Sequence, residues 1–203
     1  MGGKQPMRID QINRSPVYQR RAFDRAGRSR RSDLAREFDG VDDVVQANTE
    51  STFAVGNTIS VEAWIKPAVS IGAARQTIYG RNNSSDHPMF QFGGFAGTNR
   101  LCVVIPSGIM AETADNAVTP GEWQHVVYTR SGPGATHRIY VNGVERPLVT
   151  NATTTYVDSP SAKLIGGRNT TTARFQGAID EVAVYATALT SQQISQHYAA
   201  SGR

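Results

Sequence analysis

The chain of 203 residues contains a single cysteine, and this scarcity excludes several classes of protein. One cysteine cannot close an intrachain disulfide, so the chain is not a small disulfide-stapled secreted domain. Long apolar runs are also missing, since none approaches the ~18–20 residues of a membrane-spanning helix. Before residue 40 the apolar runs reach only two residues, whereas a secretory signal needs about 7–15. We therefore expect a protein that folds in a cytoplasm, without a secretion signal or a membrane span.

Charge is unevenly distributed along the chain, whose net charge is +4. Residues 1–37 hold ten Lys or Arg against four acidic residues, a net charge of +6, and the remaining residues hold eleven against thirteen, a net charge of −2. Nine of the ten bases in the first segment are arginine, whose guanidinium fork suits carboxylates and phosphates. This distribution divides the chain into an extended basic N-terminal arm, residues 1–36, and a mildly acidic body, residues 37–203.

The body shows short apolar runs that alternate with polar residues and are broken by Gly, Pro and Asn, a pattern typical of many-stranded all-β proteins. Asn142-Gly143 lies between two such runs and predicts a type I′ hairpin, because both residues tolerate positive φ. Strands are predicted at residues 59–66, 77–80, 89–92, 101–105, 123–130, 138–141, 144–146, 163–165 and 175–185.

One helix is expected near the end of the chain. Thr190 is suited to be its N-cap, and Gln193 three residues later completes a capping box. Leu189 and Ile194 stand where a hydrophobic staple would close, and Gly202 can end the helix. About a dozen strands with one short helix indicate a sandwich or a barrel.

Five motifs then occur in a fixed order: F-D-G at 38–40, A-W-I-K-P at 63–67, G-E-W-Q-H-V at 121–126, Y-V-N-G at 140–143 and F-Q-G-A-I-D-E-V at 175–182. No single motif is specific, but the ordered set resembles the laminin G-like branch of the concanavalin A-like jelly rolls. The resemblance covers about residues 37–200 and implies a two-sheet jelly-roll sandwich with a short C-terminal helix. Residues 1–36 have no counterpart in the pattern.

The resemblance also implies a possible role for acidic residues. Many members of this superfamily hold a calcium ion that ties the first strand to the last, and the matching positions here are Asp39 and Asp180, with Gly40 beside the first. Calcium takes about 6–8 oxygen ligands, often carboxylates mixed with carbonyls. The alternative is that Asp39 caps its own turn and Asp180 bonds to backbone.

Two tryptophans are the first candidates for stacking on sugar rings. Trp64 and Trp123 both lie within predicted strands, at positions that the family uses for packing between sheets. Because large aromatic side chains dominate protein cores, we interpret both as core residues and keep sugar contact as the alternative.

Histidines and the cysteine give no clear chemical site. His87, His125, His137 and His197 form none of the paired spacings of a zinc site. His125 falls on the strand histidine of the family pattern, which implies a structural role. Cys102 lies in an apolar run and is interpreted as a small buried hydrophobe.

Enzymes of this fold carry catalytic carboxylates at E-x-D-x-x-E or E-x-D-x-E spacing, which is missing here. Asp180 and Glu181 are adjacent, and adjacent residues of a strand point to opposite faces. A retaining glycosidase needs two carboxyl groups about 5–5.5 Å apart. The glycine-rich turn at 93–97 lacks the strand-to-helix context of a phosphate cradle. We therefore expect no catalytic site.

Three hypotheses fit the basic arm: a nucleic-acid contact, a peptide that lies along a partner protein, and a solvated tail. We favour the partner protein. The arginines expected to anchor the arm are Arg20, Arg21, Arg25, Arg28, Arg30 and Arg31.

Combined, the fold, the arm and the missing signal predict a non-enzymatic structural protein of a virus or phage particle, a decoration, cement or fibre-like protein. Its arm would bind the capsid or a neighbouring virion protein, and its jelly roll would be displayed as a homo-oligomer and could bind host glycans. The alternative is a stand-alone lectin-like carbohydrate-binding module. A glycan-cleaving enzyme is the third hypothesis and the least supported.

Overall fold

The computed structural model describes most of the body and four residues of the arm. The described residues are 7–8, 35–47, 57–71, 74–81, 89–94, 97–105, 108–132, 134, 136–153, 163–168 and 173–202. The anchoring arginines predicted between positions 20 and 31 lie outside these residues, so their role stays a prediction.

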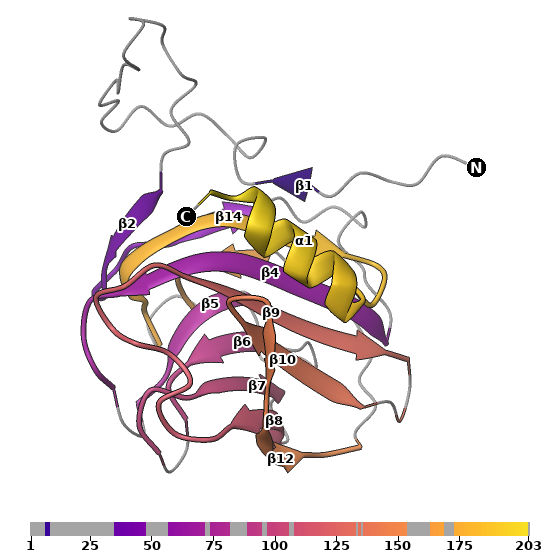
Figure 1. Ribbon diagram of the computed structural model, residues 1–203. Coiled ribbons are helices and arrows are strands. Elements are labelled where there is room, and N and C mark those ends of the chain that lie inside the picture. Colours follow the sequence, from indigo (N-terminus) through magenta and orange to yellow (C-terminus); the bar gives the residue numbers. More distant parts are fainter. Residues whose placement is uncertain are drawn as a thin grey trace, which may run out of the picture.

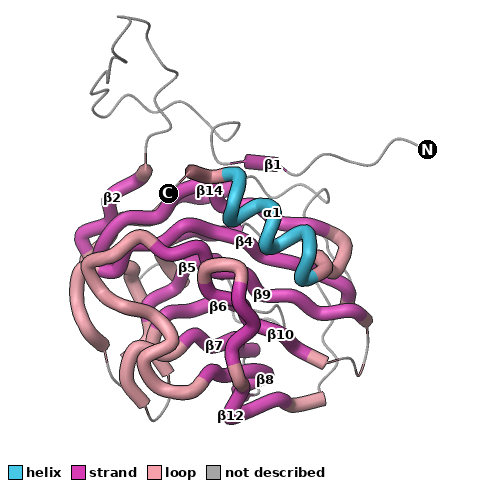
Figure 2. Tube along the Cα trace, in the orientation of Figure 1, coloured by secondary structure: helices cyan, strands magenta, loops and turns pink. Residues whose placement is uncertain are grey.

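The described chain is almost entirely strand and connecting loop, with one helix (Figure 2). The elements are β1 (Met7–Arg8), β2 (Arg36–Asp39), β3 (Val45–Ala47), β4 (Thr58–Pro67), β5 (Gln76–Arg81), β6 (Met89–Phe92), β7 (Leu101–Ile105), β8 (Gly108–Thr113), β9 (Gln124–Ser131), β10 (His137–Val141), β11 (Val144–Arg146), β12 (Leu148–Asn151), β13 (Lys163–Ile165), β14 (Gln176–Tyr185) and α1 (Ser191–Ala200).

The described strands form two antiparallel sheets packed as a sandwich, which confirms the predicted jelly-roll architecture. The first, here the helix-side sheet, has the order β1-β14-β4-β9-β10-β11, with β2 also paired to β14. The second has the order β12-β8-β7-β6-β5-β13-β3. Helix α1 lies across the outer surface of the helix-side sheet (Figure 1), where its side chains contact β4, β9, β10 and the end of β14.

Alternation along β4 separates the core from this outer surface. Ile59, Val61, Ala63 and Ile65 point inward and belong to the main hydrophobic core. The intervening side chains therefore face outward, toward α1. The second sheet contributes to the core the inward side chains of β6, β7 and β8: Phe90, Phe92, Leu101, Val103, Ile105 and Met110. Burying each of the larger ones stabilises the fold by about 1.5–3 kcal/mol.

The predicted strands all occur, several with the expected bounds. Five described strands were missed: β1, β2, β3, β8 and β12. Strand β12 alternates between partly buried and exposed residues at a sheet edge, so no apolar run marks it. Strand β8 begins with Gly108 at φ 150° and contains a register shift, which obscures its period.

The local signals for the hairpin and the helix are confirmed. Asn142 and Gly143 have φ of 52° and 76° between β10 and β11, as a type I′ turn requires. The Thr190 side chain accepts from the backbone N–H of Gln193, and the Gln193 side chain accepts in return from Thr190. Capping of this kind is worth about 1 kcal/mol.

One corner of the sandwich brings the F-D-G motif into contact with the turn after β13. The Phe38 ring packs edge-on against Phe175, with ring centroids 6.3 Å apart. It also occupies the space where a Cβ of Gly166 would stand, and Gly166 has φ of 78°. Phe38 therefore joins the first strand of the body to the turn after β13.

Two short strands share one edge of β14. Strand β2 pairs with Gln176–Ile179, and β1 pairs with Ala183 and Val184, both antiparallel to β14. The arm therefore contacts its own domain at Met7 and Arg8, and residues 9–35 connect two strands that lie on the same sheet edge.

Candidate functional site

The outer surface of the helix-side sheet holds a cluster of titratable side chains centred on Glu62. His125 Nε2 donates to Glu62 Oε1 at 2.6 Å, and the Tyr185 hydroxyl donates to Oε2 at 2.8 Å. His197 Nδ1 lies 3.1 Å from both carboxylate oxygens. The single carboxylate of Glu62 on β4 is thereby hydrogen-bonded to side chains from β9, β14 and α1.

Burial and hydrogen bonding act on Glu62 in opposite directions. Burial raises the pKa of the Glu62 carboxyl, whereas the hydrogen bonds from His125 and Tyr185 and the imidazole charges lower it. The net result is a pKa below the ordinary value of 4.5, so the group is a carboxylate at neutral pH. A buried carboxylate with three donors is well satisfied and holds these elements in register.

Aromatic rings stack beside this carboxylate. Trp64 lies 5.9 Å from Tyr198 and 5.3 Å from His125, measured between ring centroids. Trp64 is only 4% exposed, which confirms that it is a packing residue. Its position differs from expectation, however, because it packs between the sheet and α1 and not between the two sheets.

Trp123 is in a different environment. It directly precedes β9 and is half-buried, and continuing the alternation back from His125 puts it on the same outer surface. The register of β4 and β9 ends at Ile65 and Gln124, next to Trp123 and the exposed Lys66, and just beyond them the Gly121 N–H donates to the Pro67 carbonyl at 2.7 Å. Tyr198 and Tyr185 are also half-buried. We call the surface formed by Lys66, Trp123, Tyr185, His197 and Tyr198 the helix-side face.

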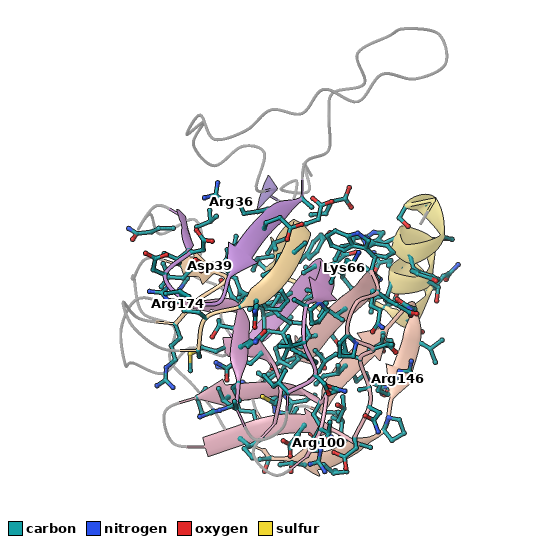
Figure 3. The ribbon with its side chains drawn as sticks, turned by 90° about the vertical axis from the view of Figure 1, so that its left-hand side faces the viewer. Arg36, Asp39, Lys66, Arg100, Arg146 and Arg174 are labelled. Atoms are coloured by element: carbon teal, nitrogen blue, oxygen red, sulfur yellow. The ribbon has the colours of Figure 1, made fainter. Side chains whose placement is uncertain are left out.

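The helix-side face gathers the exposed aromatic surface of the described chain. Of its described Phe, Tyr and Trp residues, those with more than marginal exposure are Trp123, Tyr185 and Tyr198. Figure 3 shows Lys66 on the side nearer to α1, whereas Asp39 and Arg174 lie on the far side and Arg100 at the opposite end.

The two predicted calcium ligands are not brought together. Asp39 is opposite Gln176 in the β2–β14 register, and Asp180 lies four residues further along β14, a separation of about 13 Å. Asp39 Oδ1 instead accepts the N–H of Val41 at 2.7 Å. That bond, with weaker ones from neighbouring N–H groups, lowers the pKa of the exposed Asp39 carboxyl. The turn-capping alternative is thus observed, and calcium binding stays a prediction.

Asp180 and Glu181 lie at an irregularity of β14. The register against β4 shifts between Asp180 and Ala183, and Glu181 has φ of 45°. Simple alternation therefore fails here, contrary to the expectation for adjacent residues. Asp180 is buried and accepts the N–H of Glu181 at 2.9 Å.

The glycine-rich turn encloses an ion-pair network. Arg100 donates to Asp115 at 2.6 Å and to Glu112 at 3.0 Å. A Cβ at Gly94 would approach Glu112 and Arg100, and one at Gly97 would approach Arg100 and Asp115. The hydrogen bond from Arg100 lowers the pKa of Asp115. The glycines thus make room for a structural ion pair.

The remaining candidate groups are buried. Cys102 is fully buried, and burial raises the pKa of its thiol to about 12. His137 contacts the Tyr128 hydroxyl and the Ala152 carbonyl, and burial lowers the pKa of its imidazole. Across the described ranges, no group of three or more His, Cys, Asp or Glu has the arrangement of a metal site.

Sequence reasoning missed the centre of the site. Glu62 and Tyr185 were not predicted as site residues, and His197 was considered only as a zinc ligand, although Glu62 alternates with apolar residues in a strand whose other face is buried. The sequence feature that could have identified Glu62 is a charged residue two positions before Trp64, on the same face of a strand. Its partners come from positions 63, 123 and 135 residues away, and no local pattern reports such distances.

Comparison with known proteins gives the fold a family. The family model described as the concanavalin A-like lectin/glucanases superfamily matches residues 39–195. None of the curated proteins compared with the chain matches it. In the part of the chain that the structure describes, no helix is long and apolar enough to span a bilayer.

Several solved structures share the fold. Domain 4 of AbnA, an extracellular arabinanase from Geobacillus stearothermophilus solved with arabinotriose, is 22% identical over 71% of this chain and 68% of that one, with a TM-score of 0.54. A putative carbohydrate-binding protein from Bacteroides ovatus is 21% identical over 80% of this chain and 46% of its own, with a TM-score of 0.63. The CBM40 of the Ruminococcus gnavus IT-sialidase, solved with α2,3-sialyllactose, is 13% identical over 81% and 98%, with a TM-score of 0.62.

Proposed function

The chain belongs to the concanavalin A-like lectin/glucanases superfamily, and from this premise we propose that it is a non-catalytic carbohydrate-binding module that binds glycans on the helix-side face. The observation that carries the proposal is the placement of the half-buried aromatic residues. Trp123 and Tyr198 are assigned to one face, and the exposed Lys66 and Trp123 adjoin the last pair of the β4–β9 register.

The chemistry of this face suits a sugar. The C–H surface of a pyranose packs on the exposed side of an aromatic ring, and the indole of Trp123 offers the largest such ring here. The ammonium group of Lys66 can donate hydrogen bonds to hydroxyl or carboxylate oxygens at the edge of the sugar that packs on this indole. A few placed polar groups around an apolar contact are typical of small-ligand sites.

The neighbours support the proposal by analogy of fold. Two of them were solved with bound sugars, arabinotriose and α2,3-sialyllactose, one neutral and one anionic. At these identities the likeness extends to the fold and not to the ligand, so both sugar classes enter the test.

Binding to a glycan microarray tests the proposal. The array should carry arabino-oligosaccharides and sialylated oligosaccharides. We expect the protein to retain a discrete set of glycans, and Trp123→Ala to lose them while its thermal midpoint stays near that of the wild type. Val149→Ala, an exposed apolar change on β12, is the matched control and should retain them. No retention of any glycan, or equal retention by Trp123→Ala, would contradict the proposal.

The virion role remains a prediction of the sequence. It rests on the arm, whose predicted anchoring arginines lie outside the described residues, and the same holds for the capsid partner, the homo-oligomer and the location in a particle. Glycan binding on the body and attachment through the arm are compatible, since they use different segments.

A further inference from the structure

Helix α1 is attached unevenly to the sheet beneath it. Its first half is held by apolar packing, because Leu189 and Ile194 join Val127 and Tyr140 in a cluster separate from the main core. Ile194 is the buried residue of the helix. In addition, Ser60 Oγ accepts the N–H of Leu189 at 2.9 Å.

The second half of α1 depends on polar and ring contacts. His197 is 38% exposed at its side chain and reaches Glu62 at 3.1 Å. Tyr198 stacks on Trp64 and His125. The carboxylate of Glu62 is therefore the charged anchor of this half of the helix.

We propose that Glu62 is an acid-sensitive latch, whose protonation releases the C-terminal half of α1 from the sheet. The groups that face its carboxylate are His125 from β9, Tyr185 from β14 and His197 from α1. All three donate to it. When Glu62 is protonated, one of its oxygens carries a hydrogen and becomes a donor. That oxygen then meets a donor from its partner, so at least one of the hydrogen bonds to Glu62 is lost. Asp180 of β14 lies opposite Trp64 in the register of β14 and β4, and Tyr198 of α1 stacks on Trp64 and His125.

The release also alters the ligand surface, because Tyr198 belongs to the helix-side face. This consequence rests on the proposed function, whereas the latch does not. Glycan binding is then expected to weaken under acidic conditions together with the protection of α1.

Hydrogen exchange along the backbone, corrected for the intrinsic pH dependence, tests the latch between about pH 3 and 7. In the wild type we expect the amides of residues 196–200 to lose about tenfold or more of their protection as the pH falls, while β9 amides stay protected. Glu62→Gln should abolish this pH dependence. Glu145→Gln, at an exposed pair with Arg138, is the matched control and should retain it. Simultaneous loss of protection in α1 and β9, or a wild-type response in Glu62→Gln, would overturn the latch.

A second variant keeps the proposal testable if Glu62→Gln does not fold. His197→Asn changes a partly exposed side chain and should lower the protection of residues 196–200 already at pH 7. Wild-type protection in His197→Asn would overturn the proposal. Glycan binding measured over the same pH series distinguishes the latch from the proposed function. Absence of glycan binding at every pH contradicts the proposed function, whereas a pH-dependent loss of α1 protection supports the latch even when no glycan binds.

Discussion

The ring of Phe38 fills the space in which a side chain at Gly166 would stand. These residues come from β2 and from the turn after β13, which are far apart in the sequence. Their contact, with Phe175 packed edge-on against the same ring, joins the motifs at 38–40 and 175–182 and the turn after β13 into one packing unit. Phe38 is 3% exposed, so the unit closes one edge of the core.

Replacing Gly166 by alanine tests this unit. Gly166→Ala should destabilise the protein by about 2–4 kcal/mol, because a Cβ would overlap the Phe38 ring and a positive φ disfavours alanine. Gly121→Ala is the matched control, since Gly121 has a similar φ of 83° but nothing near a Cβ, and should cost about 1 kcal/mol. Urea denaturation measures both. Equal losses in the two variants would contradict the role of Phe38.

Glu62→Gln probes the buried carboxylate. We expect a loss of about 2 kcal/mol at pH 7, because charge-assisted hydrogen bonds from His125, Tyr185 and His197 are replaced by weaker ones. Glu145→Gln, whose partner Arg138 is exposed, should cost well under about 1 kcal/mol.

The pH dependence of this loss has a defined sign. The pKa of Glu62 is lower in the folded protein than its ordinary value of 4.5. Its stabilising contribution is therefore complete above pH 4.5 and is lost as the pH falls through the folded-state pKa. Denaturation at a series of pH values should show the difference between wild type and Glu62→Gln shrinking below about pH 4.5. A difference that stays constant would contradict the lowered pKa.

Cys102 should be inert in the folded protein. Its thiol is fully buried and burial raises its pKa to about 12, so both access and thiolate are lacking. We expect an aromatic disulfide reagent to react with Cys102 only at the rate of unfolding, and rapidly in urea. Fast reaction of the native protein would show that the strand β7 is open at this position.

Thermal denaturation with and without a chelator tests whether the stability of the protein depends on calcium. Because Asp39 and Asp180 lie about 13 Å apart along β14, one ion cannot bind both directly at ligand distances of about 2.3–2.6 Å. We expect an unchanged midpoint. A midpoint that falls by several degrees on chelation would show that the protein binds a structural calcium ion.

Strand runs and local signals made most of the fold predictable from the sequence. The Asn142-Gly143 turn and the Thr190 capping box depend on residues that are adjacent or three apart, and both are confirmed. The edge strand β12 was missed because half of its residues face solvent. The site was less predictable, because Glu62 gains its meaning from partners on three other elements and no single-sequence pattern brings them together.

A calorimetric titration of the wild type and Trp123→Ala with the glycan that the array retains best tests the glycan site most directly. We expect saturable binding by the wild type and an affinity lower by about tenfold or more in Trp123→Ala, because about 1.4 kcal/mol of ring contact is lost. Equal affinities in the two proteins, each folded at the temperature of the titration, would contradict the placement of the glycan site on the helix-side face.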